Sequence, residues 1–344
     1  MLQLKNKTQF EATIAVLPNE NAVDTLYVIV KATFLSGNKI EIAENQSSIV
    51  MADEYWGEPG QSSLKYASEL HLTKPSTDIV MIGKALSPDK HPVSQIDVML
   101  AVAGRKKVVR VFGDRQWTHG FWGLRITPPV PFESMPLVYE RAFGGVHKIS
   151  PDKQEVLFEA RNPVGSGFKG KRSKKELIGT KLPNLEDPAQ LIKKISDLPT
   201  PACFGYVESS WEPRKSFAGT YDDAWQQKRA PYLPEDFDPR FFNAAHPDLV
   251  CSGYLKGGEP VMIKGMSHNG PLKFKLPVCQ LEAAVRIAGK TEYPALNLET
   301  ILIETNESHF SMLWRAAVEC DKKTLKVEQI DINPKNLHID ERTG

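Results

Sequence analysis

The sequence contains no long run of apolar residues and almost no excess of charge. A membrane-spanning helix requires about 18 consecutive apolar residues, and the longest candidate among the 344 residues, Leu26 to Leu35, is interrupted by Lys31. Residues 1–10 have no apolar segment after their basic residues, unlike a secretory signal. The formal net charge of +1 gives no support for binding nucleic acid or an anionic membrane. We therefore expect a cytoplasmic chain that binds neither.

Cysteine and histidine are sparse and scattered. The four cysteines contain no CxxC pair, and a chain of this length does not need disulfides to fold. Free thiols in a reducing compartment are expected for Cys203, Cys251, Cys279 and Cys320. No HExxH motif is present, and no two of the eight histidines have the spacing of ligands on one helical face. That leaves only a metal site assembled from remote residues, so we predict no metal and no cofactor.

Alternation of apolar and polar residues predicts strands in both ends of the chain. A period of two begins at Phe10, and segment 26–34 is rich in β-branched and aromatic residues. The clearest hairpin spans residues 95–112, with the chain turning at 103–106. Strand-like alternation resumes after Pro247 and continues to about residue 332. The two ends therefore read as two β regions.

The segment between them, residues 127–247, is dense in proline and glycine, which interrupt strands and helices alike. Only short helices are expected there, one over 188–195 with Asp187 as its N-cap and another over about 221–228. Its many aromatic residues favour a packed insertion over a flexible linker.

These patterns predict a mainly β fold, with antiparallel sheets or barrel-like β regions, a long irregular insertion and a few short helices. The expected division is an N-terminal β region, the Pro/Gly- and aromatic-rich segment and a C-terminal β region, over residues 1–126, 127–247 and 248–344.

Three stretches come close to catalytic motifs, and each lacks a required feature. Residues 165–172 approach a phosphate-binding loop, but Arg172 stands where a Ser or Thr would hold Mg²⁺. Residues 265–269 approach a nucleophile elbow, but Asn269 replaces the final glycine. The acidic residues of 235–238 flank an aromatic residue and could suggest the carboxylate pair of a glycosidase. They lie beside prolines, however, and are typical of turns. We therefore predict no catalytic residues.

Residues 211–238 are unusually rich in the side chains that dominate protein interfaces, with aromatic, arginine and acidic residues interleaved. One interpretation is a rigid lattice in which Arg214 and Arg229 pair with Asp222 or Asp236 between packed rings. The other is a recognition surface for a protein, and a stiff loop can serve both purposes because it loses less entropy on binding. The residues that we predict for a protein-partner surface are Arg141, Trp211, Arg214, Tyr221, Asp222, Trp225, Arg229 and Phe237.

Several further stretches form a pattern that covers nearly the whole chain. Together with residues 211–238, they are Thr77–Ala85, Gly113–Trp117, Met135–Gly145, Arg161–Gly167, Arg240–Pro247, Leu296–Thr300 and Leu313–Arg315. In this order they resemble a type VI secretion accessory family of effector adaptors, long catalogued as a domain of unknown function. The resemblance implies a protein that binds a secreted effector in the cytoplasm and helps load it on the spike and its PAAR-type tip. It implies no enzymatic activity and no catalytic residues.

We therefore expect a non-enzymatic adaptor or chaperone whose partners are a secreted effector protein and the spike and tip proteins of the type VI machine. The insertion would present a groove for a segment of the effector, and exposed strand edges could also pair with an extended segment. Two alternatives stay open: a secreted hydrolase effector acting on glycan or peptide, and a structural component of the spike.

Overall fold

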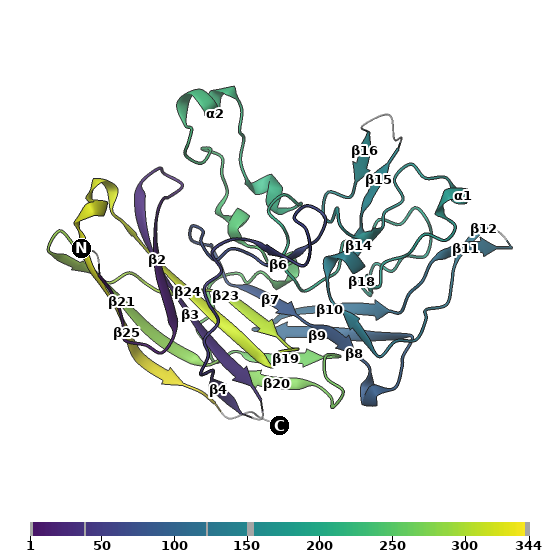
Figure 1. Ribbon diagram of the computed structural model, residues 1–344, viewed down its shortest axis with the longest axis horizontal. Helices are drawn as coiled ribbons and strands as arrows, with labels where there is room; N and C mark the ends of the chain where they lie inside the picture. Colours follow the sequence, from purple (N-terminus) through teal and green to yellow (C-terminus); the bar gives the residue numbers. More distant parts are fainter. Residues whose placement is uncertain (1–2, 38, 122, 150–154, 341–344) are drawn as a thin grey trace.

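The computed structural model describes residues 3–37, 39–121, 123–149 and 155–340, and strands dominate it (Figure 1). Strands take up 43% of the chain and helices 9%, which confirms the predicted mainly β class. Three larger sheets carry most of the hydrophobic core, and each is an open sheet. No helix within the described ranges has the length and apolar character needed to cross a membrane.

The largest sheet has six strands drawn from both ends of the chain. Its order is β2 (Glu11–Pro18), β3 (Asp24–Ser36), β24 (His309–Glu319), β23 (Asn297–Glu304) and β7 (Asp78–Ile82), with β4 (Ile40–Ile42) also beside β3. Only β7 and β23 are parallel. Residues 25–34 of β3 are all buried, so both of its faces are covered. Burial on both faces explains why this strand is apolar along its length and does not alternate cleanly.

The second sheet joins the two ends of the described chain, because β1 runs parallel to β25. Its order is β1 (Gln3–Asn6), β25 (Val327–His338), β21 (Val278–Ile287) and β22 (Lys290–Glu292). The third sheet has the order β18 (Leu185–Glu186), β10 (Arg105–Phe112), β9 (Gln95–Val102), β19 (Pro260–Lys264) and β20 (Leu272–Lys275). The predicted hairpin is thus confirmed as β9 and β10, with a tighter turn at Ala103 and Gly104, both at positive φ.

The remaining elements of the described ranges are short, both inside and outside the irregular segment. The two-stranded pairs are β5 (Glu54–Tyr55) with β6 (Leu64–Tyr66), β8 (Lys84–Leu86) with β13 (Ser134–Pro136), β11 (Trp117–Gly120) with β12 (Gly123–Ile126), β14 (Phe143–Gly144) with β17 (Ser166–Gly167), and β15 (Val146–Lys148) with β16 (Val156–Phe158). The helices are α1 (Lys174–Leu177), α2 (Asp223–Lys228), and the 3-10 helices η1 (Pro88–Lys90), η2 (Tyr139–Arg141), η3 (Arg214–Phe217), η4 (Pro239–Phe242), η5 (Pro247–Leu249) and η6 (Asp321–Lys326).

One of the two predicted helices is present and the other is wrong. Helix α2 lies inside the predicted range 221–228. Residues 188–195 form turns and irregular chain instead. Asp187 does not cap a helix there, because its carboxylate closes a local turn by accepting a hydrogen bond from the Ala189 amide at 2.8 Å.

Apolar packing extends beneath the irregular segment. The main core cluster runs through all three larger sheets, and a second, smaller cluster consists of Trp117, Phe143, Leu177, Leu182 and Ile192. The segment is therefore a packed structure, as its aromatic content predicts. It covers the upper side of the sheets in Figure 1, and the loop that carries α2 rises highest from it.

Candidate functional site

Residues 217–242 form a long projecting loop around α2, which we call the aromatic arm (Figure 1). Its two limbs leave the body of the protein next to each other, because η3 and η4 pack together at its base. Six of the eight residues predicted for a partner surface belong to the arm or lie just before its first limb: Arg214, Tyr221, Asp222, Trp225, Arg229 and Phe237. Phe237 lies on the returning limb.

Arg214 holds the base of the arm together. Its Nη1 donates to the Val207 carbonyl at 2.6 Å and its Nε to the Phe241 carbonyl at 2.9 Å. The guanidinium also lies 5.3 Å from the centre of the Phe241 ring. Burial lowers the pKa of Arg214 from its usual value. Because its hydrogen bonds go to carbonyls, the predicted pairing of Arg214 with Asp222 or Asp236 is wrong.

The two limbs are cross-linked further out by Thr220 and Asp236. The Asp236 carboxylate accepts hydrogen bonds from the Thr220 amide at 2.9 Å and hydroxyl at 2.7 Å, and these bonds lower its pKa. The Asp238 amide donates to the Phe217 carbonyl at 3.0 Å. Gly219, at φ +79°, permits this approach, since a Cβ there would lie 2.9 Å from the Asp236 carboxylate. The arm is thus a closed, hydrogen-bonded structure.

The tip of the arm presents aromatic rings to solvent. Asp222 caps α2 by accepting a hydrogen bond from the Trp225 amide at 2.8 Å. The Trp225 indole donates to the Tyr232 carbonyl at 2.8 Å, and its ring meets Tyr221 edge-on with centroids 4.7 Å apart. Tyr221 is 53% exposed and Tyr232 40% exposed. Local bonds therefore hold these rings in place while their outer faces stay accessible.

Arg229 attaches the arm to the rest of the protein, whereas Phe237 packs within the arm. The Arg229 guanidinium donates to the Leu233 carbonyl at 2.8 Å and to the Glu20 carbonyl at 2.6 Å, so the predicted pairing of Arg229 with an aspartate is also wrong. Glu20 lies in the turn between β2 and β3, which stands beside the arm in Figure 1. The Phe237 ring packs on Phe242 with centroids 5.4 Å apart.

The remaining two predicted residues lie below or beside the arm. Trp211 is only 2% exposed and packs edge-on against Tyr139, with centroids 5.5 Å apart. Arg141, in η2, is partly exposed and donates to the Asn184 side chain at 2.9 Å. It lies 3.9 Å from Asp114. The predicted set thus divides into a buried support, Trp211 and Arg214, an exposed tip, and Arg141 outside the arm.

Two small apolar hollows adjoin each other at the base of the arm, and no sequence pattern indicated them. They have volumes of about 160 and 170 Å³ and share Val207, Pro213 and Pro247 as lining residues. A cavity of about 150 Å³ accepts a benzene-sized group. Tyr139 lines the first, and its buried hydroxyl finds no partner among the described residues. Asn243 lines the second, and its Oδ1 is likewise unpartnered within the described ranges.

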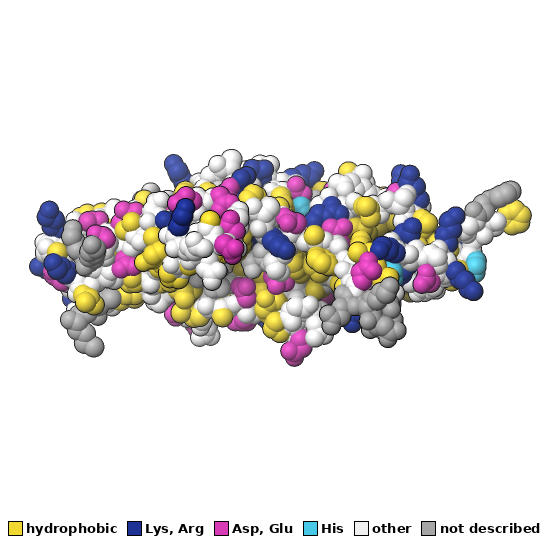
Figure 2. All heavy atoms as spheres, turned by 90° about the horizontal axis from the view of Figure 1, so that it is seen from above, with side chains coloured by type: hydrophobic (Ala, Val, Ile, Leu, Met, Phe, Trp, Pro, Cys, Tyr) yellow, Lys and Arg dark blue, Asp and Glu magenta, His cyan; other side chains and the backbone are white. Residues whose placement is uncertain are grey.

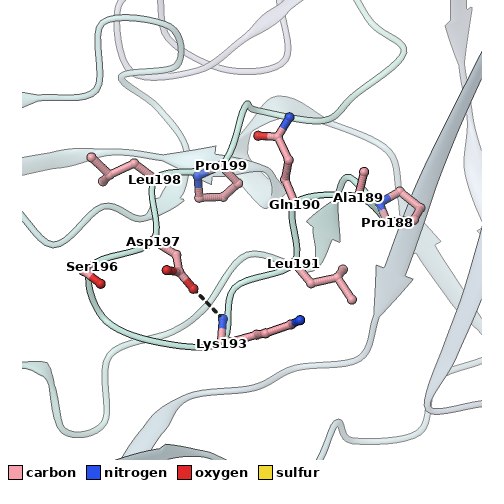
Figure 3. A pocket seen from close by; sticks show the side chains of 9 residues that line it. All are labelled: Pro188, Ala189, Gln190, Leu191, Lys193, Ser196, Asp197, Leu198 and Pro199. Carbon is pink, nitrogen blue, oxygen red and sulfur yellow. Dashed lines mark hydrogen bonds between the residues drawn. The ribbon is translucent and has the colours of Figure 1, made fainter.

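A wider depression of about 440 Å³ is a weaker candidate for a binding site (Figure 3). A single loop, residues 188–199, supplies its whole lining. The Asp197 carboxylate accepts hydrogen bonds from the Lys193 and Lys194 amides at 2.9 and 3.0 Å, which closes the loop on itself. This carboxylate is occupied in holding the loop and does not serve as a free ligand group.

The near-catalytic stretches take part in local structure as well. Ser267 accepts a hydrogen bond from the Asn269 amide at 3.1 Å in a turn, without the strand-to-helix step of a nucleophile elbow. Asp238 accepts hydrogen bonds from Arg240, which lower its pKa. In the part of the chain that the structure describes, no three His, Cys, Asp or Glu side chains converge to hold a metal ion. All four cysteines are buried free thiols, as predicted.

Comparison with known proteins gives one positive result. No curated protein and no solved structure matches the chain. A bacterial family profile, described as "Uncharacterized protein conserved in bacteria", matches residues 21–315. That range includes the arm, the hollows at its base and most strands of the three larger sheets. The chain therefore belongs to this conserved bacterial family, DUF2169.

Proposed function

We propose that this protein is a non-enzymatic adaptor that binds a secreted effector in the cytoplasm and helps load it on the spike and tip proteins of a type VI secretion machine. The resemblance of its motifs to effector adaptors motivates the choice of system. The aromatic arm is the observation that carries the proposal of protein binding, because it exposes Tyr221 and Tyr232, beside the half-buried Trp225, on a scaffold fixed by hydrogen bonds.

Such a scaffold has the properties of an interface hot spot. Trp, Tyr and Arg account for most strong contacts in protein interfaces. Exposed aromatic rings also gain from burial against a partner, about 25 cal/mol for each Å² of apolar surface covered. Because Trp225 is already ordered by Asp222 and by the Tyr232 carbonyl, little of its entropy is lost when a partner covers it.

The hollows at the arm base supply a second contact for the same partner. Their linings are almost entirely apolar, with Val207, Pro213 and Pro247 between them. An extended effector segment could insert one apolar side chain into each hollow while its neighbouring part lies against the arm. Covering apolar segments of the effector in this way would keep it soluble until it is transferred to the spike.

The test is affinity purification of the tagged protein from its native host, followed by mass spectrometry of the proteins bound to it. We expect one effector and components of the spike to be enriched with the wild-type protein and lost with Trp225→Ala. Tyr293→Ala is the matched control, because Tyr293 is an exposed aromatic residue, 65% accessible, that lies outside the arm. Enrichment that is equal for both variants would refute the role of the arm.

Deletion of the gene separates the proposal from its rivals. Loss of an adaptor should stop the secretion of one effector and leave sheath contraction intact. Loss of a structural spike component would stop all secretion, and a hydrolase effector would itself appear outside the cell and degrade glycan or peptide. Either of these results would contradict the adaptor proposal.

A further inference from the structure

A wide hollow lies away from the arm, beside α1 and the β15–β16 hairpin. Its volume is about 810 Å³. The loop 163–168 and Gly144 and Gly145 form much of its wall, and three cationic side chains, Lys148, Arg172 and Lys181, also line it. Among the described residues that line it, none is acidic. We call it the basic hollow.

The positive charge extends beyond the lining. Residues 145–181 contain nine Lys and Arg and four Asp and Glu, and Figure 2 shows many Lys and Arg side chains at this end of the molecule. The described acidic residues are already engaged. Glu155 pairs with Lys171 at 2.8 Å, and Glu159 with Arg161 at 2.6 Å. Glu176 accepts hydrogen bonds from Ser173, which lower its pKa.

The lining cations are not neutralised in the same way. Arg172 donates to the carbonyls of Phe168 at 2.8 Å and Val146 at 3.1 Å, which fixes its guanidinium without a negative charge. Lys148 and Lys181 are exposed and form no ion pair with a carboxylate of the described ranges. An uncompensated positive hollow favours an anionic ligand and repels a cationic one.

The glycine-rich wall does not form a phosphate-binding cradle. The Ser166 and Phe168 amides donate to the Ala142 and Gly144 carbonyls at 2.9 Å, so they are not free to hold phosphate oxygens. Close packing explains the glycines, since a Cβ on Gly165 would lie 2.6 Å from the Ala142 carbonyl. The groups left to bind a ligand are the separate cationic side chains of Lys148, Arg172 and Lys181. Such spacing suits the carboxylates of successive Asp or Glu residues in a polypeptide.

We propose that the basic hollow binds an acidic, extended segment of the partner polypeptide. The inference rests on the proposed adaptor function for the identity of the partner, but the binding chemistry belongs to the hollow alone. Lys148 and Lys181 pair with Asp or Glu side chains of that segment. Arg172 contributes its fixed charge from the wall of the hollow.

The experiment measures the fluorescence anisotropy of a labelled poly-glutamate peptide titrated with the full-length protein at low ionic strength. The test variant combines Lys148→Ala with Lys181→Ala and leaves Arg172 in place, because Arg172 supports the wall. The control combines Lys106→Ala with Lys290→Ala, two exposed lysines outside the hollow, and changes the net charge equally.

We expect the wild-type protein to bind poly-glutamate and not poly-lysine, with affinity falling as salt is added. The test variant should bind roughly two- to thirty-fold more weakly, as expected for losing two exposed ion pairs, and the control should bind like the wild type. Equal losses in both variants, or no binding by the wild type, would overturn the proposal. Displacement of the peptide by ATP or an oligonucleotide at lower concentration than by unlabelled poly-glutamate would overturn it in favour of a phosphate ligand.

The two proposals fail separately. If the effector is captured through Trp225 but the Lys148 and Lys181 variant captures it equally well, only the basic hollow has been misassigned. If no effector is captured and the peptide still binds in the hollow, the adaptor function fails and the acidic ligand stands.

Discussion

Replacing Arg214 with methionine should release the base of the aromatic arm without unfolding the sheets. The side chain is buried and spans the two limbs, with hydrogen bonds to the Val207 and Phe241 carbonyls. Methionine keeps part of the apolar stem and removes all donors, so both carbonyls lose their charged partner. Arg214→Lys is the matched control, because it keeps the charge but cannot direct two donors as the planar guanidinium does.

The expected cost follows from these two contacts. A hydrogen bond to a charged group contributes about 1.5–3 kcal/mol, so two contribute about 3–6 kcal/mol before the guanidinium's own desolvation is subtracted. After this subtraction, we expect Arg214→Met to lower the free energy required to open the arm by about 2–4 kcal/mol. Since about 1.4 kcal/mol corresponds to a factor of ten, arm opening should become roughly thirty- to several-hundred-fold more frequent.

Hydrogen exchange followed by mass spectrometry is the appropriate assay. The Thr220 and Asp238 amides are bonded across the two limbs, so their exchange should accelerate by that factor in Arg214→Met. Amides of β3 and β24 should keep their wild-type rates, and Arg214→Lys should lie between. Unchanged exchange in the arm, or equal acceleration in the central strands, would refute the role assigned to Arg214.

Three further predictions concern the body of the protein. Arg315 and Glu299 form a fully buried pair at 2.7 Å, so Arg315→Met should lower the free energy of unfolding in urea by about 3–5 kcal/mol, and adding Glu299→Leu should restore much of it. The hydrogen bond to Glu304 raises the pKa of His309, so the protonated side chain stabilises the fold at about pH 6. This contribution is lost as the pH rises through the raised pKa. The difference in the free energy of unfolding between wild type and His309→Gln should therefore shrink by about pH 9. Burial raises the pKa of Cys203 to about 11, so a thiol reagent should modify the four buried cysteines rapidly only after denaturation, and rapid labelling of the native protein would contradict this.

Local patterns in the sequence predict local structure well here. In the β9–β10 hairpin, Val98 and Val109 lie opposite each other and are both fully buried, as the alternation of the two strands requires. By contrast, β1 pairs with β25 from the other end of the chain, and one sequence contains no local signal for such a contact. The wrong helix over 188–195 has a physical cause, since Asp187 and Asp197 use their carboxylates to satisfy backbone amides in turns.

In the candidate site, too, the features with a local sequence pattern were predicted, and those set by tertiary contacts were not. Residue types predicted an aromatic, arginine-rich recognition segment, but they could not distinguish Trp211 from Trp225. Trp211 is buried because Tyr139, from a distant part of the chain, packs on its ring. Arg214 and Arg229 bind carbonyls, which are present at every residue and leave no mark in the sequence. Burial and backbone partners are set by tertiary packing, so only the structure identifies the exposed tip.

The adaptor account depends most directly on the affinity of the purified effector for the arm. Isothermal titration calorimetry should compare wild type, Trp225→Ala and Tyr293→Ala against the effector recovered from the native host. The account predicts that Trp225→Ala binds about thirty-fold or more weakly, the effect of losing a hot-spot residue worth about 2 kcal/mol or more, while Tyr293→Ala binds like the wild type. Equal affinities for all three proteins would contradict it.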